Sequence, residues 1–323
     1  MATYLVTGAA GFIASRVASQ LLDQGNRVVG VDNMNDYYDV RLKQYRVEQL
    51  NQREGFKFLN LDIEDRDALR KGIGGESIVG VLNLAARAGV RYSMENPFVY
   101  LSTNSLGTLN LLELMVEKGI KKMVLASTSS LYAGQEMPFV ESLPVNTPIS
   151  PYAASKKAAE VMAYSYHHLY GLDISVVRYF TVFGPCGRPD MSIFRFIKWI
   201  AEGTPIELFG DGSQSRDFTY VEDVARGTIA ALKEVGYEII NVGGGKNPVS
   251  LNKIIAWIEN HLEKKASVNR KPFHKADMVT TWADISKAAK LLDWRPQVSV
   301  EDGIAKTVEW HLANRDWLQT IKL

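Results

Sequence analysis

The chain has 323 residues and a formal net charge of +1, with 46% hydrophobic and 23% charged residues. These values are typical of a globular protein, and a near-neutral charge gives no argument for a nucleic acid or an anionic membrane as partner. The single cysteine, Cys186, excludes an intrachain disulfide, and the N-terminal sequence lacks a signal-peptide pattern, so we expect a cytoplasmic protein without membrane spans.

The first half alternates short apolar runs with longer helical patterns. The runs predicted as strands span residues 3–8, 26–33, 57–63, 78–86, 122–128 and 174–180. The clearest helical patterns span 12–25, 104–119 and 152–171. Strands without polar alternation, separated by helices, indicate a parallel sheet that is covered on both faces. We therefore predict an α/β fold with a doubly wound parallel sheet of the Rossmann type.

The second half has a different texture. A segment rich in Gly and Pro is predicted as a loop (181–191), followed by helices (192–203, 219–233, 250–265), strands (205–210, 238–244) and two helical stretches around 293–300. We expect two lobes. Residues 1–180 form the Rossmann domain, to which 219–248 return, and residues 181–218 and 249–323 form a smaller α/β lobe.

A glycine-rich turn follows the first predicted strand. In "TGAAGFIA" (7–14), Gly8 permits a tight turn, Gly11 lets the backbone approach a pyrophosphate, and Ala14 is the third small position, next to the strand. The predicted helix that begins here would meet the phosphate charge with its N-terminal amides. Ordinary strand–helix turns can have the same spacing, so this loop needs a second signal.

The second signal is acidic. The next predicted strand ends in Asp32, 24 residues after Gly8, where a carboxylate accepts from the 2′-hydroxyl of an adenosine ribose. The same carboxylate would repel a 2′-phosphate, which favours NAD over NADP. Asp62 ends another strand, where the adenine would lie. Together these features predict dinucleotide binding.

A tyrosine and a lysine begin the helix predicted at 152–171. Pro151 suits a first helical turn, and Tyr152 and Lys156 then share one face as an i, i+4 pair. A free tyrosine has a pKa of about 10, and we expect the Lys156 ammonium and the positive nicotinamide of NAD⁺ to lower it. The phenolate could then take a proton from an alcohol while hydride leaves the same carbon. On any other helix this spacing would indicate a surface pair.

Four hydroxyl residues follow the strand predicted at 122–128. Ser127, Thr128, Ser129 and Ser130 lie at its carboxyl end, where a polar turn is the alternative interpretation. We predict that Thr128 shares a hydrogen bond with the substrate hydroxyl and Tyr152.

With these residues the chain resembles the extended short-chain dehydrogenase/reductase family. The matching positions are Gly8, Gly11, Asp32, Asp62, residues 83–86, Asn104, Thr128, Tyr152 and Lys156. Within this family it looks most like the UDP-glucuronate 4-epimerases, because of longer strings at 32–39, 86–97, 178–191 and 216–224. The resemblance covers essentially the whole chain.

The resemblance implies a tightly held NAD⁺ and a UDP-sugar substrate. Tyr152 would remove the proton of the sugar 4-hydroxyl while hydride passes from C4 to the nicotinamide. The 4-keto sugar would turn over and receive the hydride on its other face, so that C4 is inverted without net redox. The cofactor contacts implied are Gly8, Gly11, Phe12, Ile13, Asp32, Asn33, Asp62, Ile63, Leu84, Ala85, Ala86, Asn104, Ser127, Tyr152, Lys156 and Tyr179.

For the substrate, the resemblance implies Arg216 at the diphosphate, Phe209 at the uracil, Arg188 on the nucleotide side and Asp277 near the ribose. Arg91 would reach the substrate or form a structural ion pair.

A 4-keto uronic acid is a β-keto acid, which readily loses CO₂, so its carboxylate must be held. Ser129, Ser130 and Thr181 are the candidates, because hydroxyl donors bind the anion without promoting enolate formation. Similar UDP-glucuronate decarboxylases have a glutamate at the Ser130 position, and similar UDP-galactose epimerases an asparagine at the Thr181 position.

Alternatives remain. The chain could be a UDP-hexose 4-epimerase, a UDP-glucuronate decarboxylase or a non-catalytic NAD-sensing protein of the same fold. It departs from the family pattern at Ala14, Arg87 and Ala133, none of which is a reacting group. The resemblance also implies a homodimer formed through the helices at 104–119 and 152–171. No Cys/His cluster has metal-ligand spacing, so we expect no metal.

Overall fold

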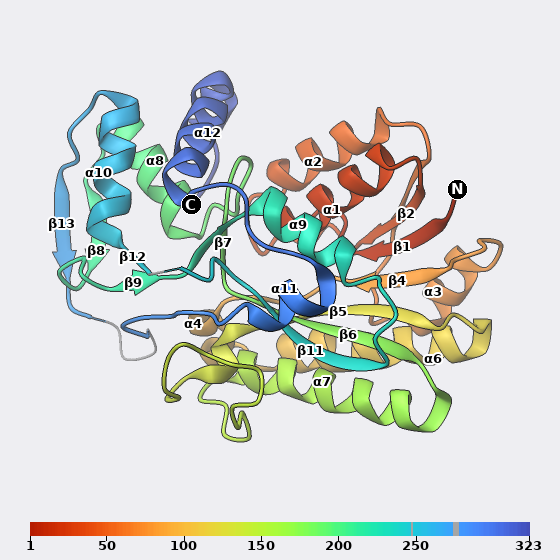
Figure 1. Cartoon of the computed structure of the whole chain (residues 1–323). Coiled ribbons are helices and arrows are strands. Elements are labelled where there is room, and N and C mark those ends of the chain that lie inside the picture. The colour runs from red at the N-terminus through yellow and green to blue at the C-terminus, as the bar shows by residue number, and fades with distance from the viewer. Residues whose placement is uncertain (247, 274–277) are drawn as a thin grey trace.

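A parallel sheet forms the centre of the molecule (Figure 1). The computed structural model describes residues 1–246, 248–273 and 278–323. The sheet has seven strands in the order β11-β6-β5-β4-β1-β2-β3, and each neighbouring pair is parallel. The strands are β1 (Thr3–Thr7), β2 (Arg27–Asp32), β3 (Phe56–Asn60), β4 (Gly80–Asn83), β5 (Lys122–Thr128), β6 (Asp173–Tyr179) and β11 (Tyr237–Val242). The strand order reverses between β1 and β4, which confirms the predicted doubly wound fold.

Helices cover both faces of this sheet. The helices on one face are α1 (Phe12–Asp23), α2 (Arg41–Asn51) and α9 (Val221–Ala230), and those on the other are α3 (Arg66–Ile73), α6 (Gly107–Lys118) and α7 (Pro151–Tyr170) (Figure 1). Each face has its own buried hydrophobic cluster, one centred on α1 and α9 and the other on α6 and α7. Because both faces are buried, the strands are apolar without alternation.

The remaining elements lie mostly beyond the carboxyl ends of the sheet (Figure 1). Three small sheets pair β7 (Thr181–Phe183) with β10 (Phe218–Tyr220), β8 (Ile206–Phe209) with β13 (Val268–Lys271), and β9 (Ser215–Arg216) with β12 (Val249–Ser250). The other long helices are α8 (Ser192–Glu202), α10 (Leu251–Leu262), α11 (Ser286–Leu292) and α12 (Val300–Ala313). The short helical segments are α4 (Val90–Glu95), α5 (Phe98–Tyr100), a π-helix (Leu101–Leu106), a 3₁₀ turn (Ser129–Tyr132) and α13 (Arg315–Leu318).

The boundaries of α7 have clear local causes. The Ser150 hydroxyl accepts from the amide of Ala153, Pro151 opens the first turn, and Gly171 ends the helix at a φ of 63°. The helix therefore fits the prediction for 152–171 to within one residue at each end.

Three predictions need correction. The segment 181–191 was predicted as a loop, but its first residues form β7; the helix predicted at 219–233 begins only at Val221, because the residues before it form β10. β7 and β10 pair with each other in parallel, and three residues are too few to show strand periodicity. The helix predicted at 104–119 also starts as a π-helix, up to Leu106. Among the described residues, no helix is long and apolar enough to cross a bilayer.

Candidate active site

The main cavity opens at the carboxyl ends of the strands, on both sides of the point where the strand order reverses. Its walls come from the turns that follow β1, β2, β3 and β4, from the carboxyl ends of β5 and β6, and from the first turns of α7. This is the position at which doubly wound sheets bind ligands.

The glycine turn lines this cavity and is tightly packed. Gly8 has a φ of +70°, and a Cβ there would lie 2.8 Å from the amide nitrogen of Ala85. A Cβ on Gly11 would lie 2.8 Å from the carbonyl oxygen of Gly8, so neither position tolerates a side chain. Gly11 caps α1 without a side-chain hydrogen bond, which leaves the first amides of the helix for a ligand. This cradle suits the pyrophosphate of a dinucleotide.

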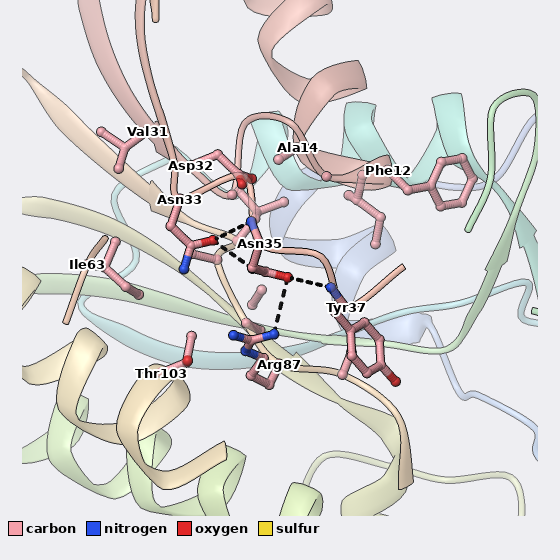
Figure 2. Close-up of a pocket in the computed structure, with 18 of the residues that line it drawn as sticks. Phe12, Ala14, Val31, Asp32, Asn33, Asn35, Tyr37, Ile63, Arg87 and Thr103 are labelled. Carbon is pink, nitrogen blue, oxygen red and sulfur yellow. Dashed lines mark hydrogen bonds between the residues drawn. The ribbon is translucent and has the colours of Figure 1, made fainter. Parts of the chain in front are cut away.

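Asp32 lies at the end of β2, nearly buried. One carboxylate oxygen accepts from the amide of Ala10 at 3.2 Å and the other from the amide of Met34 at 2.8 Å. The ammonium of Lys43, on α2, approaches the second oxygen at 3.4 Å. Asp32 thus joins the glycine turn to the loop that follows β2. Its carboxylate faces the same cavity (Figure 2).

The loop after β2 crosses the cavity toward the β4 side. The side chain of Asn35 donates to the amide oxygen of Asn33 at 2.6 Å and accepts from Arg87 at 3.1 Å (Figure 2). The backbone of Arg87 is held in turn by Asn104, whose amide oxygen accepts at 2.8 Å and whose amide nitrogen donates at 3.0 Å. Asn33 also donates to Asp62 at 2.7 Å, so the ends of β2, β3 and β4 are linked.

Tyr152 and Lys156 lie one turn apart on α7 and both line the cavity. The Thr128 side chain lies near enough to the Tyr152 phenol to act on its pKa in the lowering direction, so a predicted neighbour is in reach. The Lys156 ammonium donates to the carbonyl of Ala126 at 2.9 Å, which fixes it against the end of β5.

Burial dominates the pKa values of this pair. It raises the pKa of Tyr152, while Thr128 and Arg188 act in the lowering direction. The sequence predicted a lowered pKa with NAD⁺ bound. In the chain alone the direction is opposite, because desolvation of the phenol by the surrounding protein disfavours its anion. Burial lowers the pKa of Lys156 to about 8, and the Glu160 carboxylate works against this shift.

The candidate substrate residues lie around this cavity and a second one beside it. Arg188 lines both cavities and Thr181 only the second. The Arg188 guanidinium donates to Asp190 at 3.0 Å and lies 5.7 Å from the ring centre of Tyr37. The Arg91 guanidinium lies 4.4 Å from the ring centre of Phe209, on β8, which places these two predicted residues in contact.

Four further substrate candidates remain. Arg216, on β9, donates to the carbonyl oxygens of Ser215 at 2.8 Å and Val279 at 3.2 Å. Ser129 and Ser130 form the 3₁₀ turn after β5, where the Ser130 amide donates to the Thr128 hydroxyl at 3.1 Å. Asp277 lies outside the described residues.

The cavity brings together most of the predicted residues. Those in its wall are Gly8, Gly11, Phe12, Ile13, Asp32, Asn33, Asp62, Ile63, Leu84, Ala85, Ala86, Ser127, Tyr152, Lys156, Tyr179 and Arg188. Those outside its wall are Arg91, Asn104, Thr128, Ser129, Ser130, Thr181, Phe209 and Arg216.

The wall also contains residues that the site prediction missed: Val31, Asn35, Tyr37, Tyr38, Lys43, Leu61, Ala88, Thr103 and Ala126. Asn35, Tyr37 and Tyr38 belong to the string at 32–39, which carried a usable signal. Lys43 had none. Within the described ranges, no group of three or more His, Cys, Asp or Glu side chains is placed to hold a metal ion.

Comparisons with known proteins agree with this geometry. The family model described as "NAD dependent epimerase/dehydratase family" matches residues 4–243. A UDP-glucuronate 4-epimerase from Thermodesulfobacterium geofontis is 61% identical over 100% of both chains.

Two solved structures are also similar. The UDP-glucuronic acid 4-epimerase from Bacillus cereus, in complex with UDP-glucuronic acid and NAD, has a TM-score of 0.89 and 37% identity, covering 97% of this chain and 99% of the other. The UDP-glucose 4-epimerase from Thermotoga maritima, with UDP-glucose, has a TM-score of 0.87 and 31% identity, covering 97% and 99%.

Proposed function

The chain belongs to the NAD dependent epimerase/dehydratase family, and from this premise we propose that it inverts C4 of UDP-glucuronate to give UDP-galacturonate. The reaction has no net redox and releases no CO₂. The observation that carries the proposal is one cavity that joins the glycine turn and Asp32 to the pair Tyr152 and Lys156. The choice of a uronic acid is supported by the relative that is 61% identical over the whole chain.

When bound, NAD⁺ would supply a reversible acceptor for the hydride of C4. Gly8, Gly11 and the first turn of α1 would hold its pyrophosphate, and Asp32 its adenosine ribose. The proposed cofactor is NAD rather than NADP, because a 2′-phosphate would lie against the Asp32 carboxylate.

The chain's own residues would handle the proton. Tyr152 takes the proton of the 4-hydroxyl as hydride leaves C4 and gives it back after the sugar has turned. Thr128, which lies beside the phenol, would orient it by a hydrogen bond. Lys156, held by the Ala126 carbonyl, contributes positive charge that favours the phenolate. Because burial alone raises the pKa of Tyr152, this positive charge and that of the cofactor are needed for a base at neutral pH.

The uronate carboxylate needs neutral donors. We assign this role to Ser129, Ser130 and Thr181, of which the first two follow directly after Thr128 and the third begins β7. A hydroxyl holds the carboxylate without adding positive charge that would stabilise the enolate formed on loss of CO₂.

The nucleotide end would lie in the smaller lobe, which we propose consists of residues 181–218 and 249–323. Arg188 faces this side from the main cavity, and Phe209 presents a ring already covered on one side by Arg91. Arg216 would contact the diphosphate. The Phe209 ring is the stacking partner we propose for uracil.

A homodimer and a cytoplasmic location are part of the same proposal. On α7, Val161, Met162 and Leu169 are exposed at helical spacing, and Phe98 and Leu101 are exposed on the neighbouring α5 and π-helix. Such apolar surface favours pairing of two copies through α6 and α7. The single cysteine, which is buried, is consistent with a reducing compartment.

The test is product analysis after incubation of the purified protein with UDP-glucuronate. UDP-galacturonate supports the proposal, whereas CO₂ with a UDP-pentose indicates a decarboxylase, and turnover of UDP-glucose alone indicates a hexose epimerase. Tyr152→Phe should abolish epimerisation and keep bound NAD, while Tyr164→Phe, at an exposed position of the same helix, should leave the rate unchanged. Retained turnover in Tyr152→Phe would overturn the mechanism.

A further inference from the structure

Arg46 is a buried cation that uses all of its donors. It lies on α2 with 4% of its surface exposed. Its Nε donates to the carbonyl of Cys186 at 3.2 Å, and its Nη2 donates to Cys186 at 2.8 Å and to Gly187 at 3.1 Å. Its Nη1 donates to the carbonyl of Ala10 at 3.0 Å and to the phenol of Tyr38 at 2.7 Å. A guanidinium has five N–H groups, and here each has an acceptor.

None of these acceptors is charged. Over the described ranges, no carboxylate forms an ion pair with Arg46, although the neighbouring Lys43 has Asp32. Buried cations are normally paired with an anion, because desolvation of the charge is expensive. A buried arginine bound only to neutral oxygens therefore calls for a role beyond holding α2 in place.

The acceptors belong to three separate segments of the cavity wall. Ala10 is in the glycine turn, Tyr38 in the loop after β2, and Cys186 and Gly187 in the loop after β7. Ala10 is held through both of its backbone polar groups, since its amide donates to Asp32 and its carbonyl accepts from Arg46. One side chain thus fixes the glycine turn against the loop that carries Arg188.

The loop after β7, which Arg46 joins to the glycine turn, has an unusual backbone. Cys186 has a φ of 55°, in the left-handed region that non-glycine residues rarely adopt. Its carbonyl accepts two of the Arg46 hydrogen bonds, which hold that conformation. Two residues later, Arg188 projects to the boundary of the two cavities. Arg46 thus binds the two carbonyls that directly precede Arg188.

We propose that Arg46 is a positioning residue that couples the dinucleotide pocket to the nucleotide-sugar pocket. It keeps the glycine turn and the Arg188 loop in one arrangement, and the phosphates of bound ligands supply the counter-charge that it lacks. The proposal rests on the proposed binding of NAD and a UDP-sugar, but not on the inversion of C4. It predicts that occupation of one pocket stabilises the other ligand through this side chain.

The test measures how fast NAD leaves the purified holoprotein, with and without UDP. In the unaltered protein, UDP should slow NAD release. In Arg46→Met, NAD release should be about tenfold faster or more, as expected for loss of hydrogen bonds from a charged donor, and UDP should no longer slow it. Arg53→Met is the matched control, because Arg53 follows the same helix and pairs with Asp23 at the surface. Arg53→Met should release NAD at the same rate as the unaltered protein, and UDP should slow that release to the same extent.

A purely structural role would lower the melting temperature and leave the response to UDP intact, and that result would overturn the proposal. So would an absence of any UDP effect in the unaltered protein. If Arg46→Met does not fold, Arg46→Lys carries the test: it keeps the charge but cannot reach all three segments, so it should release NAD faster with a reduced UDP effect. A lysine variant that equals the unaltered protein would contradict the bridge. Because no turnover is measured, these outcomes are independent of whether UDP-glucuronate is epimerised.

Discussion

Glu160 and Arg178 form a two-pronged ion pair directly behind the Tyr152–Lys156 turn. The Arg178 Nε and Nη2 donate to the two carboxylate oxygens at 2.9 and 2.8 Å, and each side chain is 1% exposed. Ser127, in the cavity wall, donates to the same carboxylate at 2.7 Å. Glu160 is one turn beyond Lys156 on α7, so its charge raises the pKa of that lysine against the larger effect of burial.

Glu160→Gln should therefore change the pH dependence of the reaction. The Glu160 charge is the interaction that raises the pKa of Lys156 against the lowering effect of burial. Without it, that pKa should fall below about 8. The positive charge beside Tyr152 would then be lost at a lower pH, so the alkaline fall in the epimerisation rate should move to lower pH. Removing one partner of a buried pair should also reduce the free energy of unfolding by about 3–5 kcal/mol.

The measurements are the pH–rate profile with UDP-glucuronate and denaturant unfolding. Glu117→Gln is the control, because Glu117 pairs with Arg70 at the surface, where an ion pair contributes little. An alkaline limb that stays in place in a folded Glu160→Gln protein would show that Glu160 does not tune Lys156.

Gly8→Ala should prevent cofactor binding. Both Gly8 and Gly25 have positive φ, at 70° and 75°, so alanine at either position carries a backbone strain of about 1–2 kcal/mol. Only at Gly8 would the new Cβ also meet backbone, 2.8 Å from the Ala85 nitrogen; at Gly25 nothing lies within 4 Å. We expect Gly25→Ala to lose modest stability and keep its NAD, and Gly8→Ala to be purified without NAD. Equal NAD contents in the two variants would contradict the close fit of this turn.

Asp32→Asn should weaken the discrimination between NAD and NADP. The carboxylate repels a 2′-phosphate, and its removal also leaves the buried Lys43 without its partner, free to attract that phosphate. With equimolar NAD and NADP, we expect the ratio bound to shift toward NADP by at least about tenfold, since each 1.4 kcal/mol corresponds to that factor. Asp23→Asn, at a surface pair with Arg53, should leave the ratio unchanged. A ratio that is equally unchanged in Asp32→Asn would remove Asp32 as the selecting group.

The long elements and the reactive pair could be predicted because their signals are local. The unbroken apolar strands and the spacing of Tyr152 and Lys156 are properties of short sequence windows. The partners of Lys43 and Arg46 could not be predicted in this way. Both residues lie on α2, which is rich in charged and polar residues, and such a pattern predicts a solvent-exposed face. Lys43 is buried against Asp32 at the end of β2, and Arg46 against the glycine turn and the loop after β7, and none of these partners lies on α2.

The direction of the Tyr152 pKa shift could not be predicted from the sequence either. A sequence can place a lysine one turn from a tyrosine, but the extent of burial depends on how α4, α5 and the π-helix pack on α7. Tyr100, on α5, contacts the Tyr152 ring at 6.0 Å between ring centres and helps to enclose it. Similarly, β7 and β10 are recognised as strands only from their pairing with each other, which the sequence does not show.

His311 should make the protein sensitive to acid. It is buried on α12 beside Phe194, and burial, aided by the positive charge of Lys198, lowers its pKa from 6.5 to about 4. The unfolded chain therefore binds a proton at a higher pH than the folded chain does. The stability from neutral His311 is complete above pH 6.5 and is lost as the pH falls through about 4, a total on the order of 3 kcal/mol.

We expect His311→Leu to flatten the dependence of the free energy of unfolding on pH between 6.5 and 4, measured by urea denaturation at each pH. His261→Leu, at an exposed position near the end of α10, should keep the slope of the unaltered protein. Other groups that titrate in this range act equally in all three proteins, so the difference in slope isolates His311. If His311→Leu and the unaltered protein lose stability in parallel, His311 titrates in the folded state much as it does in the unfolded chain, and the acid sensitivity has its source in the carboxylates instead.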